Sequence, residues 1–196
     1  MSEKGDMYER FDESVQQIVM WAQGASINAK VGWVYPESFA VAILSTGPNS
    51  VNKSLNSLGI DLRKCLQEVK KELAKKRESK HIPNFQDLKI DSSVHEMCEV
   101  ADRIREEMNR KYIELSHVFL ALLQVNDRIR KIFEDEKLCV KDFIRKIGAE
   151  APSNRNRRQR ASSHSESASL GPSRPRRLAR TWQWRSLRRR RRVRRR

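Results

Sequence analysis

Residues 47–54, GPNSVNKS, come close to the sequence of a loop that binds nucleotide phosphates. Gly47, Lys53 and Ser54 have the spacing of the motif G-x-x-x-x-G-K-[ST], but Asn52 stands where the motif has its second glycine. That glycine lets backbone N–H groups close around the phosphates, and the Cβ atom of an asparagine obstructs this geometry. We therefore favour a turn between two helices over a nucleotide site.

The three cysteines are the next candidates for chemistry. Cys65, Cys98 and Cys139 are odd in number, lie in apolar patterns and lack C-x-x-C spacing, so they predict neither a disulfide framework nor a zinc site. We expect buried, reduced thiols. Since no pair of carboxylates, no nucleophile with a base and no metal cluster stands out, the sequence predicts a protein that is not an enzyme and needs no cofactor or metal.

The sequence also bears on the compartment. No apolar run approaches the roughly 18–20 residues of a membrane span, and the polar start MSEKGDMYERFDES lacks the apolar core of a signal peptide. Together with reduced cysteines, this favours an intracellular location without a membrane partner. The cytoplasm is the first choice, and the plastid and the nucleus are alternatives.

Charge divides the chain into two parts. Of the 41 Lys and Arg residues, 17 are arginines after residue 150, and of the 25 Asp and Glu residues only Glu166 lies there, which leaves 24 of each sign in residues 1–150. The formal charge of +16 therefore belongs to residues 151–196, which are all but the first residue of the predicted tail (150–196). The tail is rich in Ser, Arg and Pro and has few apolar side chains, so we expect it to be disordered.

The end of the tail has the chemistry of a nucleic-acid-binding arm. Guanidinium groups pair with phosphates, and indoles stack on unpaired bases. The residues that would do this are Arg176, Arg177, Arg180, Trp182, Trp184, Arg185, Arg188, Arg189 and Arg190. The tail therefore predicts RNA or DNA binding, or a nuclear or nucleolar address. The alternative is an out-of-frame or wrongly assigned terminal exon, in which case the tail has no selected role.

An internal repeat organises residues 12–149. Asp12 is a good helix N-cap, and apolar or small residues follow it at helical spacing: Val15, Ile18, Val19, Ala22, Ala25 and Ala29. A shift of 79 residues brings the same pattern back after Asp91: Val94, Met97, Cys98, Ala101, Ile104 and Met108. The match continues without a gap through YPESFAVAIL at 35–44 and ELSHVFLALL at 114–123.

After a slip of one residue, the repeat extends to the end of the second copy. The matching residues are Val51, Leu55, Ile60, Leu62, Leu66 and Val69 in the first copy and Ile129, Phe133, Leu138, Val140, Ile144 and Ile147 in the second. Each copy then predicts four helices, and the near-motif at 47–54 becomes the turn between the second and third. The fold class is all-α: repeat 1 at 8–76, a linker at 77–90, repeat 2 at 91–149 and the tail. We expect no β-sheet within 12–149.

Specific sequence motifs in the two copies resemble those of the Clp N-terminal domain, the double-repeat module in front of the AAA+ motor of Clp/Hsp100 unfoldases. They are RF at 10–11, ESFAVAIL and SHVFLALL in place of the family's TEHLLLAL, and SLGIDLRKCLQEV at 57–69, which is similar to LGVDLEKVRQEV. The resemblance covers about residues 8–149. It implies a protein-binding module without chemistry of its own, here without the motor because no Walker motif follows.

The resemblance also implies candidate binding residues. In relatives of the ClpC type, the Glu of each TEH motif helps to bind phosphoarginine on substrates. The first copy keeps the acid as Glu37 but has Ser38 for the His, and the second has Ser116 for the acid and keeps His117. Glu37 follows a proline at a helix start, so we favour a role in helix capping or in the helix dipole for it. For His117 we favour a structural role between the repeats, because no Cys, Asp or Ser partner at catalytic spacing accompanies it.

Three aromatic residues lie in the first copy, and the first interpretation for all of them is the core. They are Trp21, Trp33 and Tyr35. Trp33 and Tyr35 also lie beside Glu37 in the sequence, which makes a peptide-contact surface their alternative role. The charged run KKELAKKRESK at 70–80 is interpreted as a solvated helix end.

Two functions from different classes follow. The first is a non-enzymatic interaction module, an adaptor or accessory to a Clp-type chaperone-protease, whose partners are Clp subunits, adaptors or substrate peptides and whose body is monomeric. The second is a nucleic-acid-binding protein that acts through its tail. Salt separates them, because binding through the arginines weakens steeply with ionic strength and binding through a neutral body does not.

Overall fold

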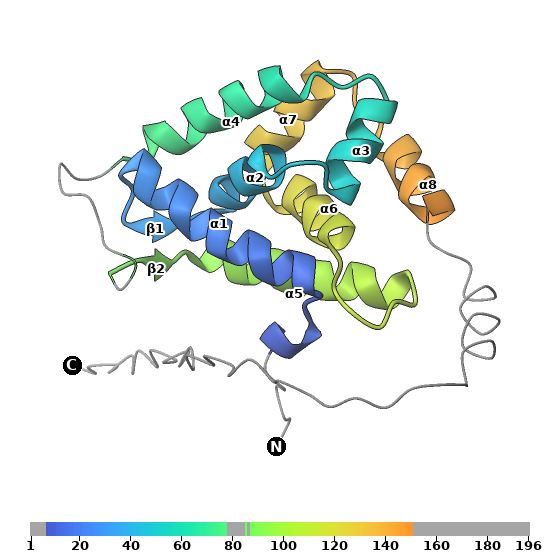
Figure 1. Cartoon of the computed structure of the whole chain (residues 1–196), viewed down its shortest axis with the longest axis horizontal. Coiled ribbons are helices and arrows are strands. Elements are labelled where there is room, and N and C mark those ends of the chain that lie inside the picture. The colour runs from blue at the N-terminus through green and yellow to red at the C-terminus, as the bar shows by residue number, and fades with distance from the viewer. Residues whose placement is uncertain (1–6, 78–84, 86, 151–196) are drawn as a thin grey trace, which may run out of the picture. The chain divides into compact units, whose positions relative to one another are not determined.

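The computed structural model describes residues 7–77, 85 and 87–150, and this part of the chain is mainly helical (Figure 1). A short 3-10 helix, Met7–Arg10, precedes the first repeat, whose helices are α1 (Glu13–Ala29), α2 (Pro36–Ser45), α3 (Ser50–Ser57) and α4 (Leu62–Lys75). The second repeat contains α5 (Ser92–Glu107), α6 (Leu115–Val125), α7 (Asp127–Asp135) and α8 (Val140–Glu150). The predicted all-α fold with two four-helix repeats is confirmed. The nucleic-acid residues predicted at 176–190 lie outside the described residues.

The two central helices, α2 and α6, are surrounded by the others (Figure 1). Nine consecutive residues are buried in each, from Pro36 to Leu44 and from Leu115 to Leu123. A helix that is apolar on all sides has to be buried on all sides, so α1 and α4 pack on α2, and α5 and α7 pack on α6. Among the described residues, no helix has the length and the apolar character needed to cross a membrane.

Equivalent positions of the two repeats are buried alike. The side chains of Val15 and Val94, Ala22 and Ala101, Ala42 and Ala121, and Leu44 and Leu123 all expose 8% of their surface or less. Both long helices also begin as predicted, because the Asp12 carboxylate accepts a hydrogen bond from the Val15 N–H and the Asp91 carboxylate accepts one from the Ser93 N–H. The helix faces predicted from the periodicity are therefore correct.

Ala42 and Ala121 are expected to tolerate no larger side chain. They are 3% and 0% exposed at the centre of α2 and α6, where added methylene groups force neighbouring side chains out of their rotamers. We expect Ala42→Leu and Ala121→Leu each to lower the free energy of unfolding by about 1–3 kcal/mol in urea denaturation. Unchanged stability in both variants would show that these faces are loosely packed.

One expectation about the repeats was wrong, because the described part contains short parallel strand pairs. β1 (Trp33–Val34) pairs with β2 (Lys89–Ile90), and Phe11 pairs with Ile113. A shift of 79 residues converts one pair into the other, so the pairing follows the repeat instead of contradicting it. Strands of two residues are too short to show the alternation by which a strand is predicted.

Each of these pairs joins the start of one repeat to the loop before the second helix of the other. The Asp12 N–H donates to the Ile113 carbonyl at 3.0 Å, and the Asp91 N–H donates to the Val34 carbonyl at 3.1 Å. The two N-cap residues thus use their side chains for the helix and their backbone for the strand pair. The two repeats are tied together reciprocally.

Candidate functional site

The near-motif for phosphate binding forms the turn between α2 and α3, as predicted. Asn52 is buried, and its Nδ2 atom donates to the carbonyl oxygens of Ile43 at 2.9 Å and Thr46 at 3.0 Å. These carbonyls lie at the C-terminal end of α2 and have no helical partner there. Asn52 therefore closes the end of a helix with its amide group, and this role was not predicted from the sequence.

Glu37 is buried in the first turn of α2, with 1% of its surface exposed. Its Oε1 atom lies 2.9 Å from the Nζ atom of Lys76 and accepts a hydrogen bond from Nδ2 of Asn126 at 3.0 Å. Its Oε2 atom accepts a second bond from Lys76 at 3.0 Å. Lys76 follows α4, and Asn126 lies between α6 and α7, so the carboxylate joins both repeats.

The burial of Glu37 adds to one expectation and corrects another. An acid in the first turn of α2 does favour the helix dipole, but this carboxylate is also the centre of a buried ion pair that the dipole argument did not include. The run at 70–80 is likewise not a solvated helix end throughout, because Lys76 is turned inward to Glu37. The partners of Glu37 lie 39 and 89 residues away in the sequence, so no local pattern could have predicted them.

The aromatic residues near Glu37 are half-buried, and both contact a lysine. The Nζ atom of Lys76 lies 4.1 Å from the centroid of the Tyr35 ring, and that of Lys89 lies 5.3 Å from the Trp33 ring. Cation–π contacts of this kind hold an ammonium group over the aromatic face. Trp21 differs from the expectation of a core residue, because it is 61% exposed on the outer side of α1.

Ser38, Ser116 and His117 are buried at the starts of α2 and α6. The Oγ atom of Ser38 lies 2.7 Å from the Oγ atom of Ser26 on α1 and accepts a bond from the Tyr35 N–H. The Nδ1 atom of His117 accepts a hydrogen bond from the Glu114 N–H at 2.9 Å, which caps α6. Burial lowers the pKa of His117 to about 4, and the nearby positive charge of Arg110 adds to this effect.

His117 predicts how stability depends on pH. A pKa lowered from 6.5 to about 4 means that the unfolded chain binds a proton first as the pH falls, so the stabilisation is complete above pH 6.5 and is lost towards pH 4. Between pH 7 and pH 4, we expect the wild type to lose about 2–3 kcal/mol more than His117→Gln, which keeps a hydrogen-bond acceptor at this position but cannot be protonated. Urea denaturation at both pH values tests this, and equal losses in the two proteins would contradict it.

The cysteines occupy three different environments. Cys65 is buried and Cys98 is half-buried, and burial raises the pKa of both thiols to about 12. Cys139 is exposed, which corrects the expectation that all three are buried. Within the described ranges, no three His, Cys, Asp or Glu side chains are grouped so that they could hold a metal ion.

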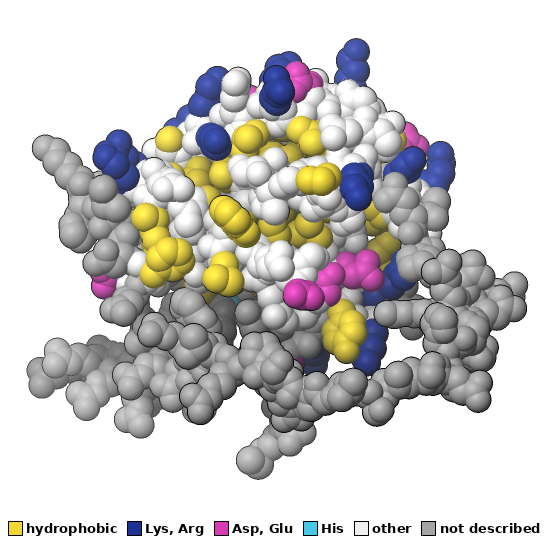
Figure 2. Space-filling model, viewed as in Figure 1, with side chains coloured by type: hydrophobic (Ala, Val, Ile, Leu, Met, Phe, Trp, Pro, Cys, Tyr) yellow, Lys and Arg dark blue, Asp and Glu magenta, His cyan; other side chains and the backbone are white. Residues whose placement is uncertain are grey.

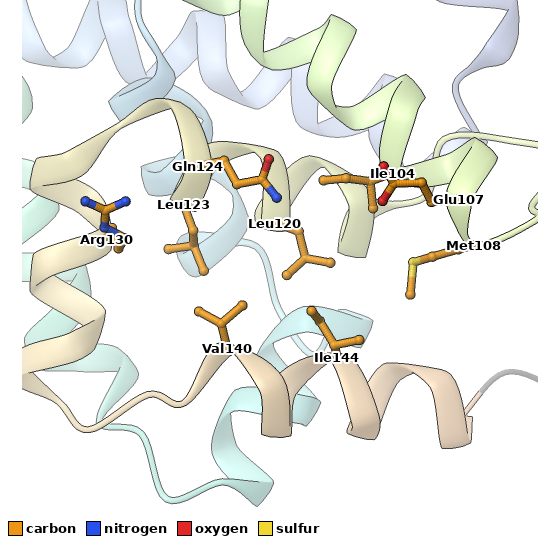
Figure 3. A pocket seen from close by; sticks show the side chains of 9 residues that line it. All are labelled: Ile104, Glu107, Met108, Leu120, Leu123, Gln124, Arg130, Val140 and Ile144. Carbon is orange, nitrogen blue, oxygen red and sulfur yellow. The ribbon is translucent and has the colours of Figure 1, made fainter.

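An apolar pocket of about 240 Å³ opens in the second repeat, and sequence reasoning missed it. Its wall is formed by apolar side chains from three helices and one helix end: Ile104 of α5, Met108 directly after α5, Leu120 and Leu123 of α6, and Val140 and Ile144 of α8. The side chains of Glu107, Gln124 and Arg130 complete the lining. Figure 3 shows the two α8 side chains pointing across the pocket towards those of α6.

The pocket exists because the last helices of the two repeats pack differently. In the first repeat, α4 packs closely on α2 and also contacts α1. The equivalent α8 has its main contact with α3 of the first repeat, so the matching space beside α5 and α6 is left partly open. The helical periodicity of residues 140–150 is the same in either arrangement, and for this reason the pocket could not be predicted.

The chain is similar to a known family along most of the described part. Residues 10–136 match the family model for the Clp repeat (R) N-terminal domain. No curated protein matches the chain in sequence.

Among solved structures, the Hsp104 N-terminal domain from Candida albicans is similar at 17% identity and a TM-score of 0.59, covering 69% of this chain and 87% of that one. The N-terminal domain of the caseinolytic protease associated chaperone ClpD from Arabidopsis thaliana has 17% identity and a TM-score of 0.53, covering 71% and 99%. The N-terminal domain of the ClpV1 ATPase from E. coli EAEC has 12% identity and a TM-score of 0.57, covering 71% and 84%. At these identities the likeness shows the fold.

Proposed function

Since this chain belongs to the family of Clp repeat N-terminal domains, we propose that it is a non-enzymatic protein-interaction module that acts as an adaptor or accessory of a Clp-type chaperone-protease or its substrates. The family supports the general role, because Clp N-terminal domains are protein-interaction modules of Clp chaperones. The finer role of adaptor or accessory rests on a surface of this chain that a partner protein could bind.

The observation that carries the proposal is the apolar pocket between α5, α6 and α8. Its apolar wall favours an apolar side chain of a partner, and Glu107, Gln124 and Arg130 offer polar groups to the partner's backbone. Ile144 is 42% exposed at this pocket although it is a large apolar residue. Covering it with a partner's side chain would remove apolar surface from water on both sides.

A pull-down with matched variants tests this proposal. Wild-type protein, treated with nuclease to remove nucleic acid, should retain Clp subunits, adaptors or substrate peptides. Ile144→Glu should lose them, because an apolar side chain of the partner would have to cover a charged carboxylate in the wall of the pocket. Arg145→Gln changes the neighbouring residue, which does not line the pocket, and should bind like the wild type. Equal recovery with all three proteins, or no Clp component with any, would contradict the proposal.

Phosphoarginine recognition is expected to be lost at Glu37. The resemblance implies that a carboxylate at this position binds the guanidinium group of the mark, but here Lys76 and Asn126 already occupy both carboxylate oxygens. We therefore expect a phosphoarginine peptide to bind residues 1–152 and the Glu37→Gln variant of the same residues with equal, weak affinity in calorimetric titration. A clear loss of affinity in the variant would show that the peptide displaces Lys76.

The tail supports a second candidate function, nucleic-acid binding. Its 17 arginines follow a body with balanced charge, so any electrostatic attraction to phosphates comes from the tail. The logarithm of the binding constant of the full chain for single-stranded RNA should then fall linearly with the logarithm of salt concentration. Residues 1–152 should not bind this RNA. RNA affinity that is independent of salt would contradict this function.

A further inference from the structure

The outer face of α1 carries no charge. We define the α1 face as Gln17, Met20, Trp21, Gly24 and Asn28, which are exposed or half-buried along one side of the helix. After Glu13, the 17-residue helix contains no charged residue. Figure 2 shows the molecule from the side on which α1 lies: the band over this helix is yellow and white, and dark blue and magenta side chains lie towards its edges.

The second repeat shows that the fold does not require an uncharged face at this place. A shift of 79 residues places the α1 face on the outer side of α5, where Trp21 corresponds to the buried Val100. The other four positions are exposed and charged in α5: Glu96, Glu99, Arg103 and Glu107. The equivalent helix of the same fold thus presents charged side chains to solvent in the second repeat and an uncharged face in the first.

Two large apolar side chains lie at the centre of the α1 face. Met20 and Trp21 are each 61% exposed, the highest fraction among the large apolar side chains of the described residues. Tryptophan is the residue type most enriched among those that dominate binding energies at protein interfaces, and methionine adapts its shape to a partner. Apolar surface of this kind, grouped on one helix, is typical of an interaction site.

Gly24 adds a place where a partner can come close. It lies one turn after Met20 and Trp21, and a Cβ atom built on it would meet nothing within 4 Å. A glycine inside a helix lowers the stability of that helix, and the open space around Gly24 shows that packing within the chain does not require it. Its missing side chain instead lets the backbone of another element approach the surface of α1.

The size and the chemistry of the α1 face indicate which occupant fits it. A helix of this length is about 25 Å long and about 10 Å wide, so its face is well below the roughly 800 Å² per partner of a stable dimer. An extended peptide needs backbone donors and acceptors, and those of α1 are used within the helix. A second helix satisfies its own backbone and needs only an apolar, uncharged contact face.

We propose that the α1 face binds an amphipathic helix of a partner protein, with Trp21 and Met20 against its apolar side and Gly24 beneath its backbone. This surface is separate from the pocket of the second repeat, which is lined by α5, α6, α7 and α8. The proposal is therefore independent of the pocket and adds a second contact to the module.

Fluorescence of Trp21 tests the proposal in the full chain. Replacing Trp33, Trp182 and Trp184 by Phe leaves Trp21 as the single tryptophan. The probe is a synthetic amphipathic helix of about 18 residues, with Leu and Ala on one face, Glu and Lys on the other and no tryptophan. We expect a saturable blue shift of the Trp21 emission with this peptide and none with a scrambled peptide of the same composition. No shift, or the same shift with both peptides, would overturn the proposal.

Matched variants locate the binding. Met20→Glu with Gly24→Arg gives α1 the residues that α5 carries at the equivalent positions, so the helix can hold them, and we expect the affinity to fall about tenfold or more. Glu99→Gln with Arg103→Gln makes two changes on α5 and should leave the affinity unchanged, as should Ile144→Glu at the pocket. Equal affinity of the α1 variant would refute the proposal. A blue shift that grows with protein concentration without peptide would do so too, because a second copy would then cover the face.

Discussion

Replacing Lys76 by Met is expected to lower the free energy of unfolding by about 3–4 kcal/mol. The Glu37 carboxylate is 1% exposed and depends on Lys76 and Asn126 for its hydrogen bonds. Removing the ammonium group leaves a buried negative charge with one amide as its remaining described partner, which costs more than the ion pair contributes in the wild type. The side chain of Lys76 is 29% exposed, and water can reach it partly. The effect is therefore placed in the lower half of the range for buried pairs.

Two control proteins make this expectation specific. Lys75→Met removes a neighbouring lysine whose side chain is 63% exposed and pairs with Glu72 at the surface, so it should cost about 0–1 kcal/mol. The double variant Glu37→Gln with Lys76→Met leaves no unpaired charge and should recover part of the loss. Urea denaturation of the four proteins measures these differences. Equal stability of the Lys76→Met and Lys75→Met variants would show that the buried pair is not needed.

Phe119→Ala is expected to cost about 3–5 kcal/mol of unfolding free energy. Phe119 on α6 is 1% exposed, and its ring centroid lies 5.1 Å from that of Phe133 on α7 and 5.1 Å from that of Phe143 on α8. Truncation removes one ring from a group of three and leaves a cavity that three helices would have to close. Since α8 already has an open pocket on one side, we also expect it to lose protection against hydrogen exchange first.

The first repeat provides the comparison for this variant. Ala40 is the residue equivalent to Phe119, and it is 1% exposed. The first repeat therefore fills its core without a large side chain at this position. Phe119→Leu keeps most of the volume and should cost clearly less than Phe119→Ala in the same urea denaturation. A loss below about 1 kcal/mol for Phe119→Ala would mean that the helices close the cavity, which would contradict a rigid aromatic core.

The features predicted correctly from the sequence are those that a short segment determines by itself. Asp12 and Asp91 cap their helices because the acceptor and the N–H group are two or three residues apart. The buried faces of α1 and α5 follow from helical periodicity. The all-α fold with its two repeats required only these local signals and the shift of 79 residues that relates them.

The features that were missed depend on residues far apart in the chain. Glu37 is buried with two partners, Lys76 at the end of α4 and Asn126 in the second repeat. No local sequence pattern indicates these contacts. Trp21 is at helical spacing but lies one step outside the apolar stripe of α1, so its type suggested the core and its position exposes it. The pocket depends on the direction of α8, which its contact with α3 determines.

The reciprocal strand pairs have a consequence for synthesis on the ribosome. The chain emerges from its N-terminus, yet the backbone of Arg10 and Asp12 pairs with Ile113, about a hundred residues later. The loop before α2 likewise forms its backbone hydrogen bonds with Lys89 and Asp91, which are synthesised later. A nascent chain that has released only the first four helices therefore exposes an apolar surface without its partner strands. We expect the first repeat to complete its fold only when the second has emerged, and its apolar surface to be accessible to chaperones until then.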